Sequence, residues 1–256
     1  MSDVLAALKP PELAAFYGRI ADVVDRNRGS VQVSLAAMLL RHWLENRNPQ
    51  SVFELEAPEH LKSRVEVLDV LEFHRGVFLT QKKGRFTGGF ERWVGIIPRL
   101  MGQPPYQKWD INLPLSMEYE SLVEMPLRYQ YTGDDADKDI LYGLRGFQLK
   151  SSVIVTATAL LRSNKVKINF RSFQAEAHDR YDFEYSEHIT VPNPDYGSKE
   201  AGAIAPKLNK IVVEHRNAKR LEDAGLAAPY KVQFKPWQVT DARFTAPAEV
   251  APILPR

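Results

Sequence analysis

The chain has 256 residues, of which 44% are hydrophobic and 26% are charged. This composition is typical of a globular protein and excludes disordered, collagen-like and disulfide-stapled chains. Lys and Arg number 34 against 32 Asp and Glu, so the formal charge of +2 lacks the basic excess of a dedicated nucleic-acid binder. Cysteine is absent, which also excludes disulfides, thiolate metal sites and cysteine nucleophiles.

The N-terminal residues contain no basic segment followed by a long apolar stretch, so no signal peptide is predicted. No run of apolar residues approaches the roughly 20 that a membrane helix needs, and we expect no transmembrane segment. The chain is therefore expected to be made in the cytoplasm in soluble form. Action in another compartment would require a dedicated export route.

The first third of the chain has the spacing of amphipathic helices. Apolar residues over 11–24 recur at three- and four-residue intervals and predict a first helix. Ser34 is a favoured N-cap for a second helix that carries its apolar face over 35–43. A third helix is expected over 58–71, with His74 near its end as a C-terminal capping residue.

After Pro104–Pro105 the pattern changes to the two-residue alternation of strands, which is found at 109–115 and again at 127–131. The acidic run 135–139 lacks the glycine and glutamate of a calcium loop and is expected to be a solvated loop. The clearest hairpin spans 147–177, and the alternation of its second strand slips by one residue, which is typical of a β-bulge.

The sequence thus predicts an α+β protein. A helical N-terminal domain is expected over residues 1–105 and a β-rich domain over residues 106–244. A proline-rich tail that is extended or loose is expected over residues 245–256.

Two carboxylates, a tyrosine and a histidine follow the hairpin within ten positions: Asp179, Tyr181, Asp182 and His188. On an extended strand Asp179 and Tyr181 share one face, and a loop after Asp182 can bring His188 back over the pair. Carboxylates bind divalent cations, and histidine transfers protons near neutral pH. The same residue types are also common on the exposed face of a surface strand.

The spacing D-x-Y-D-x5-H of these four residues resembles the active-site motif of colicin M-type bacteriocins. Those toxins hydrolyse the peptidoglycan precursor lipid II between undecaprenyl and pyrophosphate. The resemblance covers roughly residues 140–240, and it implies that the β-rich domain is a half-open barrel with Asp179, Tyr181, Asp182 and His188 as catalytic residues.

One position departs from the family pattern. The family places an arginine directly after the histidine, where it would meet phosphate oxygens, whereas this chain has Ile189. The resemblance therefore implies either that the activity is lost or that another residue contacts the phosphate, such as Arg180 or Arg216.

The resemblance also implies a divalent cation, Mg²⁺ or a similar ion, with Asp179 and Asp182 as ligands. Asp179 would be a metal ligand, the base or the nucleophile, and Asp182 would bind metal or orient His188. His188 would transfer a proton, and the hydroxyl of Tyr181 would position phosphate.

An antibacterial toxin of this kind is expected to be exported, for example by a type VI secretion apparatus, and to act in the periplasm of a target bacterium. Its expected partners are the lipid II substrate, an immunity protein and a secretion-apparatus or chaperone protein, with no nucleic acid. Two alternatives remain open from the residues: a non-enzymatic adaptor module of a secretion or assembly system, and a metal-dependent nuclease. The near-neutral charge argues against the nuclease.

Overall fold

The computed structural model describes residues 4–80, 110–160, 165–183 and 188–250. These residues form eight helices, a mixed sheet of seven strands and a separate two-stranded sheet, so the protein is α+β as predicted. No closed barrel is found among them. The predicted domain boundary at residue 105 lies outside the described residues, as does the turn of the predicted hairpin at 161–164.

The chain divides into two compact units, each assembled from separated segments. Unit 1 comprises 1–64, 124–147 and 178–234, and unit 2 comprises 65–123, 148–177 and 235–256. Strand β4 (Lys165–Tyr181) contributes its last four residues to unit 1 and the rest to unit 2.

Unit 1 combines helices with short strands. Its helices are α1 (Pro10–Arg26), α2 (Leu35–Glu45), α3 (Glu59–Lys62), α6 (Tyr129–Thr132), α7 (Asp135–Leu144) and α8 (His215–Asp223). Strand β1 (Val52–Leu55) pairs in parallel with β7 (Tyr230–Phe234), which pairs antiparallel with the end of β4. Strand β5 (His188–Pro192) pairs antiparallel with β6 (Lys210–Glu214) in the second sheet.

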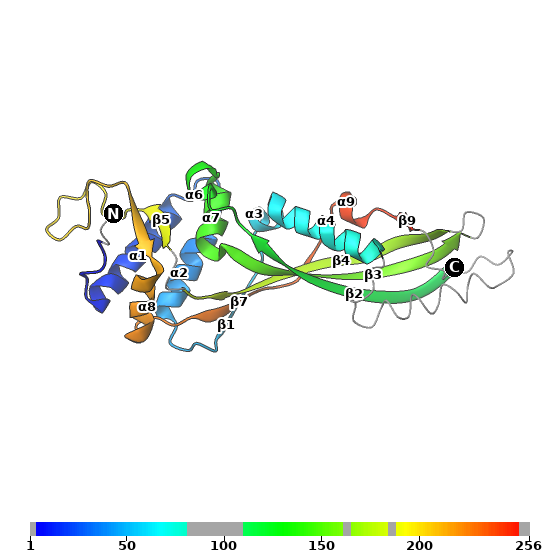
Figure 1. Cartoon of the computed structure of the whole chain (residues 1–256), viewed down its shortest axis with the longest axis horizontal. Helices are drawn as coiled ribbons and strands as arrows, with labels where there is room; N and C mark the ends of the chain where they lie inside the picture. The colour runs from blue at the N-terminus through cyan, green and yellow to red at the C-terminus, as the bar shows by residue number, and fades with distance from the viewer. Residues whose placement is uncertain (1–3, 81–109, 161–164, 184–187, 251–256) are drawn as a thin grey trace. The chain divides into compact units, whose positions relative to one another are not determined.

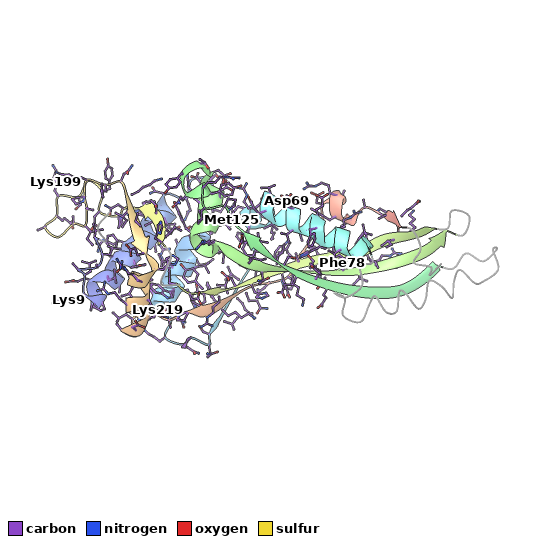
Figure 2. All side chains as sticks on the ribbon, viewed as in Figure 1. Lys9, Asp69, Phe78, Met125, Lys199 and Lys219 are labelled. Carbon is purple, nitrogen blue, oxygen red and sulfur yellow. The ribbon has the colours of Figure 1, made fainter. Side chains whose placement is uncertain are left out.

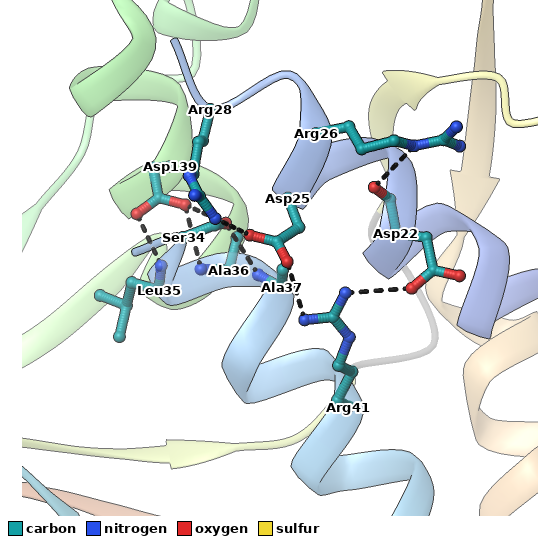
Figure 3. Close-up of polar contacts among 10 residues, drawn as sticks. All are labelled: Asp22, Asp25, Arg26, Arg28, Ser34, Leu35, Ala36, Ala37, Arg41 and Asp139. Carbon is teal, nitrogen blue, oxygen red and sulfur yellow. Dashed lines mark hydrogen bonds and ion pairs between the residues drawn. The ribbon is translucent and has the colours of Figure 1, made fainter. Parts of the chain in front are cut away.

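The first two predicted helices are confirmed. The apolar residues of α1 and α2 are buried, and the Ser34 hydroxyl accepts a hydrogen bond from the Ala37 N–H, as expected of an N-cap. The start of α2 is also bound by Asp139 of α7, whose carboxylate accepts from the N–H groups of Leu35 at 2.8 Å and Ala36 at 3.2 Å (Figure 3). These bonds satisfy backbone donors that a helix start leaves without partners.

Helix α7 also approaches α2 closely through Gly143. A Cβ atom at Gly143 would lie 3.3 Å from both the Cα and the backbone nitrogen of Ala36, so a larger residue would push the two helices apart.

Three of the sequence predictions in this region are wrong. The single helix over 58–71 is divided into α3 and α4 (Val65–Thr80), because Ser63 bonds back to the Glu59 carbonyl and caps the short first helix. The strand expected at 127–131 is instead the helical turn α6. The acidic loop expected at 135–139 is the first half of α7, because Asp134 and Asp137 bond to each other's backbone N–H and start a helix.

Unit 2 contains most of the three long strands, covered on one face by a helix. Strands β2 (Asp110–Glu124), β3 (Gly146–Leu160) and β4 are neighbours in that order, and α4 lies along them (Figure 1). The remaining elements of this unit are β8 (Trp237–Gln238), α9 (Ala242–Thr245) and β9 (Ala248–Val250); both strands pair with β4. The predicted tail is thus extended at 248–250.

The core of unit 2 lies between α4 and the sheet. Phe78 points from α4 toward the strands, with its ring 6.1 Å from that of Phe173, whereas Asp69 lies on the exposed side of the helix (Figure 2). In β4 the buried side chain of Ile168 is at an even-numbered position, whereas those of Phe173, Ala175 and Ala177 are at odd-numbered positions. The inward-facing positions therefore shift by one residue between 168 and 173, as predicted.

His74 contradicts its predicted role as a helix cap. It lies inside α4 and is completely buried, with Nδ1 2.6 Å from the Ser151 hydroxyl of β3. Burial lowers the pKa of His74 from 6.5 to about 4, so its ring is neutral at physiological pH.

Candidate functional site

The last residues of β4 belong to unit 1 and carry two of the predicted catalytic residues, Asp179 and Tyr181. In the antiparallel register Asp179 lies opposite Val232 and Tyr181 opposite Tyr230. Both partners on β7 are completely buried. The predicted shared face of Asp179 and Tyr181 is therefore confirmed, and it is the face turned toward the core. Arg180, between them, is exposed.

The carboxyl group of Asp179 is held in an environment that favours its protonated form. Burial, with a smaller contribution from the negative charge of Asp182, raises its pKa from 3.8 to about 7 against the lowering effect of a hydrogen bond from the Arg180 N–H. A carboxyl group that exchanges its proton near neutral pH is suited to accept or donate a proton in catalysis.

Tyr181 belongs to a cluster of aromatic rings. Its ring stacks on Tyr230 with 5.3 Å between centroids, and Phe183 contacts it edge-on at 5.6 Å. Phe183 in turn packs against Trp43 of α2 at 4.8 Å. The Tyr230 hydroxyl donates to the Leu39 carbonyl at 2.8 Å, which fixes β7 to α2.

Burial of Tyr181 raises the pKa of its hydroxyl above 10, and the nearby Asp179 charge adds to this effect. The phenol therefore stays protonated and able to donate a hydrogen bond.

Asp182 follows the end of β4 and is exposed. Nε of the Arg180 guanidinium forms an ion pair with its carboxylate at 3.2 Å. Of the two arginines predicted to contact phosphate, Arg180 is thus already held beside one of the predicted metal ligands.

His188 is the first residue of β5 and is exposed. Its register partner on β6 is Glu214, and the next residue, His215, starts α8 with its ring 5.1 Å from that of Phe183. This chain of neighbours places His188 and the end of β4 in the same part of unit 1. Among the described residues, however, no hydrogen bond or ion pair joins His188 to Asp179 or Asp182.

Arg216 lies beside the register partner of His188. Its Nε forms an ion pair with the Glu214 carboxylate at 2.6 Å, and about half of its side chain is exposed. The sequence interpretation missed Glu214, because nothing in its spacing from the motif indicates that β6 pairs with β5 in this register.

The predicted metal ligands Asp179 and Asp182 lie close enough for the charge of one to raise the pKa of the other. A divalent cation would relieve that repulsion. Mg²⁺ keeps several of its waters, so one or two carboxylates can suffice to hold it. A group of three acidic or histidine side chains able to hold a metal is not found in the described part of the chain.

The loop after β5 has a structural role in this arrangement. Asp195 accepts two hydrogen bonds from the Arg19 guanidinium at 3.2 Å and one from the Ile204 N–H at 2.8 Å. The Asn193 amide donates to three backbone carbonyls of the same loop. These contacts fix the base of the loop to α1, and Lys199 lies exposed farther along it (Figure 2).

No protein-family model, curated protein or solved structure matches this chain. None of the helices in the described ranges has the length and apolar character needed to cross a membrane.

Proposed function

We propose that this chain is an antibacterial enzyme that hydrolyses lipid II at the undecaprenyl–pyrophosphate linkage. The observation that supports the proposal best is the place of Asp179, held with Tyr181 on the inner face at the end of β4 and next to Asp182, with a pKa near 7. Four residues with the motif spacing thus include a carboxyl group suited to proton transfer.

The proposed reaction breaks the bond between the undecaprenyl oxygen and phosphorus and attaches the oxygen of water to that phosphorus. Asp179 accepts a proton from the water, and His188 donates a proton to the departing undecaprenyl oxygen. The Tyr181 hydroxyl donates to a phosphate oxygen. General acid and base catalysis of this kind contributes about 10² to 10⁴ in rate.

Asp179 and Asp182 would hold the divalent cation, Mg²⁺ or a similar ion, beside the pyrophosphate. When bound, this ion neutralises the negative charge of the two phosphates and of the leaving oxygen.

Arg216 takes the phosphate-binding role that the family arginine would have at Ile189. Its exposed guanidinium is paired with Glu214, the residue opposite His188, so the arginine approaches the substrate from the start of α8 and the histidine from the start of β5. Arg180, which is paired with Asp182, is the second candidate.

The proposal includes the half-open barrel that the family resemblance implies. It also includes export to the periplasm of a target bacterium, where lipid II is exposed, and partners of two kinds: an immunity protein, and a secretion-apparatus or chaperone protein.

The test is release of undecaprenol from purified lipid II by the full-length chain with Mg²⁺ in detergent. We expect activity from the wild type and a loss of at least about a hundredfold in Asp179→Ala and His188→Ala. Asp22→Asn and His178→Ala are matched controls, because Asp22 is an exposed carboxylate on α1 and His178 points to the other face of β4.

A wild type that releases no undecaprenol, or an Asp179→Ala variant as active as the wild type, would contradict the proposal. Directed expression separates the alternatives: a lipid II hydrolase kills only when sent to the periplasm, whereas a nuclease kills in the cytoplasm.

A further inference from the structure

Helix α6 and the start of β6 expose apolar and basic side chains on unit 1. The three apolar side chains remain largely accessible, with exposed fractions of 49% for Leu127, 65% for Tyr131 and 41% for Leu208. The nearby basic residues are also exposed. We call this set the α6–β6 surface; its residues are Leu127, Arg128, Tyr131, Lys207, Leu208 and Lys210.

These residues come from two segments that contact each other. The Lys210 ammonium lies 6.0 Å from the centroid of the Tyr131 ring. The Thr190 N–H of β5 donates to the Gln130 side chain at 3.3 Å, which holds α6 against the two-stranded sheet. Lys207 and Leu208 precede Lys210 by three and two residues, so the chain keeps them within about 10 Å of it.

The cations of this surface are not engaged by carboxylates, unlike several others in unit 1. Arg19, Arg41 and Arg216 each form an ion pair. Within the described ranges, neither Arg128, Lys207 nor Lys210 has an acidic side chain at ion-pair distance. Arg128 and Lys210 instead lie over tyrosine rings. Their positive charge is therefore available to an external anion.

We propose that the α6–β6 surface binds anionic phospholipid bilayers. Tyrosine and leucine side chains bordered by lysine and arginine suit a membrane interface, where the apolar groups enter the headgroup region and the cations meet lipid phosphates. A nucleic acid would leave the three apolar side chains without a partner. The charge of the whole chain is only +2, so the attraction is local to this surface.

The register of the two-stranded sheet relates this surface to the candidate site. Lys210 lies opposite Pro192 at one end of β5, and Glu214 lies opposite His188 at the other. Four residues of strand span about 13 Å. If the proposed function holds, the membrane contact lies about that distance from the histidine, which suits a substrate whose pyrophosphate lies at the bilayer surface. The lipid binding itself does not depend on that function.

The test is co-sedimentation of the full-length chain with vesicles of phosphatidylcholine alone or mixed in equal parts with phosphatidylglycerol. Each basic residue near an anionic bilayer contributes about a fivefold gain in affinity, so three residues predict binding about a hundredfold tighter to the anionic vesicles. Arg128→Glu and Lys210→Glu should each weaken that binding at least fivefold, and Tyr131→Ser should weaken it severalfold. Raising the salt concentration should weaken it as well.

Matched controls are available on β1 and β7, where Lys231 and Val52 are exposed register partners. Lys231→Glu and Val52→Ser should bind anionic vesicles as the wild type does, and circular dichroism should show that all variants are folded. Equal binding to both vesicle types, no binding to either, or control variants weakened as much as Arg128→Glu would overturn the proposal. Because sedimentation needs no lipid II, a chain that binds vesicles without hydrolysing lipid II refutes only the proposed function.

Discussion

Replacing Asp179 by asparagine should stabilise the fold at alkaline pH and have little effect at acidic pH. The Asp179 carboxyl is raised from a pKa of 3.8 to about 7 by burial and by the charge of Asp182. The folded protein therefore retains this proton more strongly than the unfolded chain does. The resulting contribution to stability is present in full below pH 3.8 and is lost as the pH rises through about 7.

The size of the effect follows from the same two pKa values. At 1.36 kcal/mol per pKa unit, the cost of ionising Asp179 in the folded protein is at most about 4 kcal/mol above pH 8. The side chain is half-buried rather than fully enclosed, so solvent screening reduces the expected cost to about 2 kcal/mol. Asparagine has nearly the same shape and carries no charge, so it avoids this cost.

Urea unfolding of the wild type and of Asp179→Asn at pH 3 and pH 9, at constant ionic strength, measures the difference. We expect similar unfolding free energies at pH 3, below the pKa of the unfolded chain, and a variant about 2 kcal/mol more stable at pH 9. Glu200→Gln is the control, because that carboxylate is exposed and forms no ion pair within the described ranges, so its replacement should cause the same small change at both pH values. If Asp179→Asn changes the stability equally at pH 3 and pH 9, the assigned environment of this carboxyl group is wrong.

Two further predictions concern buried polar groups outside the candidate site. His74 has a pKa of about 4 when folded and 6.5 when unfolded, so the wild type should lose up to about 3 kcal/mol of stability as the pH falls from 7 to 4. In His74→Gln, which can still bond to Ser151, thermal melts should show a flatter pH dependence, and an unchanged slope would contradict the assignment. Asp139→Ala should destabilise the protein by about 3 kcal/mol in urea titrations, because it leaves the buried Ser34 hydroxyl and the N–H groups of Leu35 and Ala36 without their acceptor. A cost below about 1 kcal/mol would show that water replaces the carboxylate.

The parts of the fold that sequence analysis predicted are those fixed by local patterns. Helix α2 has both an N-cap serine and an apolar stripe, and these two signals agree. The segment of β3 is rich in β-branched residues, and β4 alternates apolar and polar residues apart from one slip; both patterns are typical of strands. The shared face of Asp179 and Tyr181 follows directly from the geometry of an extended strand.

The parts that were missed depend on contacts between distant residues. The run 135–139 is expected from its sequence to be a solvated loop, yet its first aspartates favour the start of a helix. Asp139 also binds the start of α2, which lies more than 100 residues earlier in the chain. The tyrosines of α6 are two residues apart, a spacing that also fits a strand. The pairing of His188 with Glu214 depends on the register of β5 with β6, which no local signal encodes.

The division of unit 1 into three separated segments has a consequence for synthesis. Residues 1–64 include α1 and α2, but strand β7, the parallel partner of β1, ends only at Phe234. Helices α1 and α2 can pack against each other early, but the contact of α2 with Tyr230 of β7 forms only after nearly the whole polypeptide has been made. In that interval they expose surfaces that a chaperone can bind, and folding is expected to be slow because it requires contacts between remote segments. Neither unit can be produced as a contiguous fragment, so any dissection of this protein has to be made by substitution in the full chain.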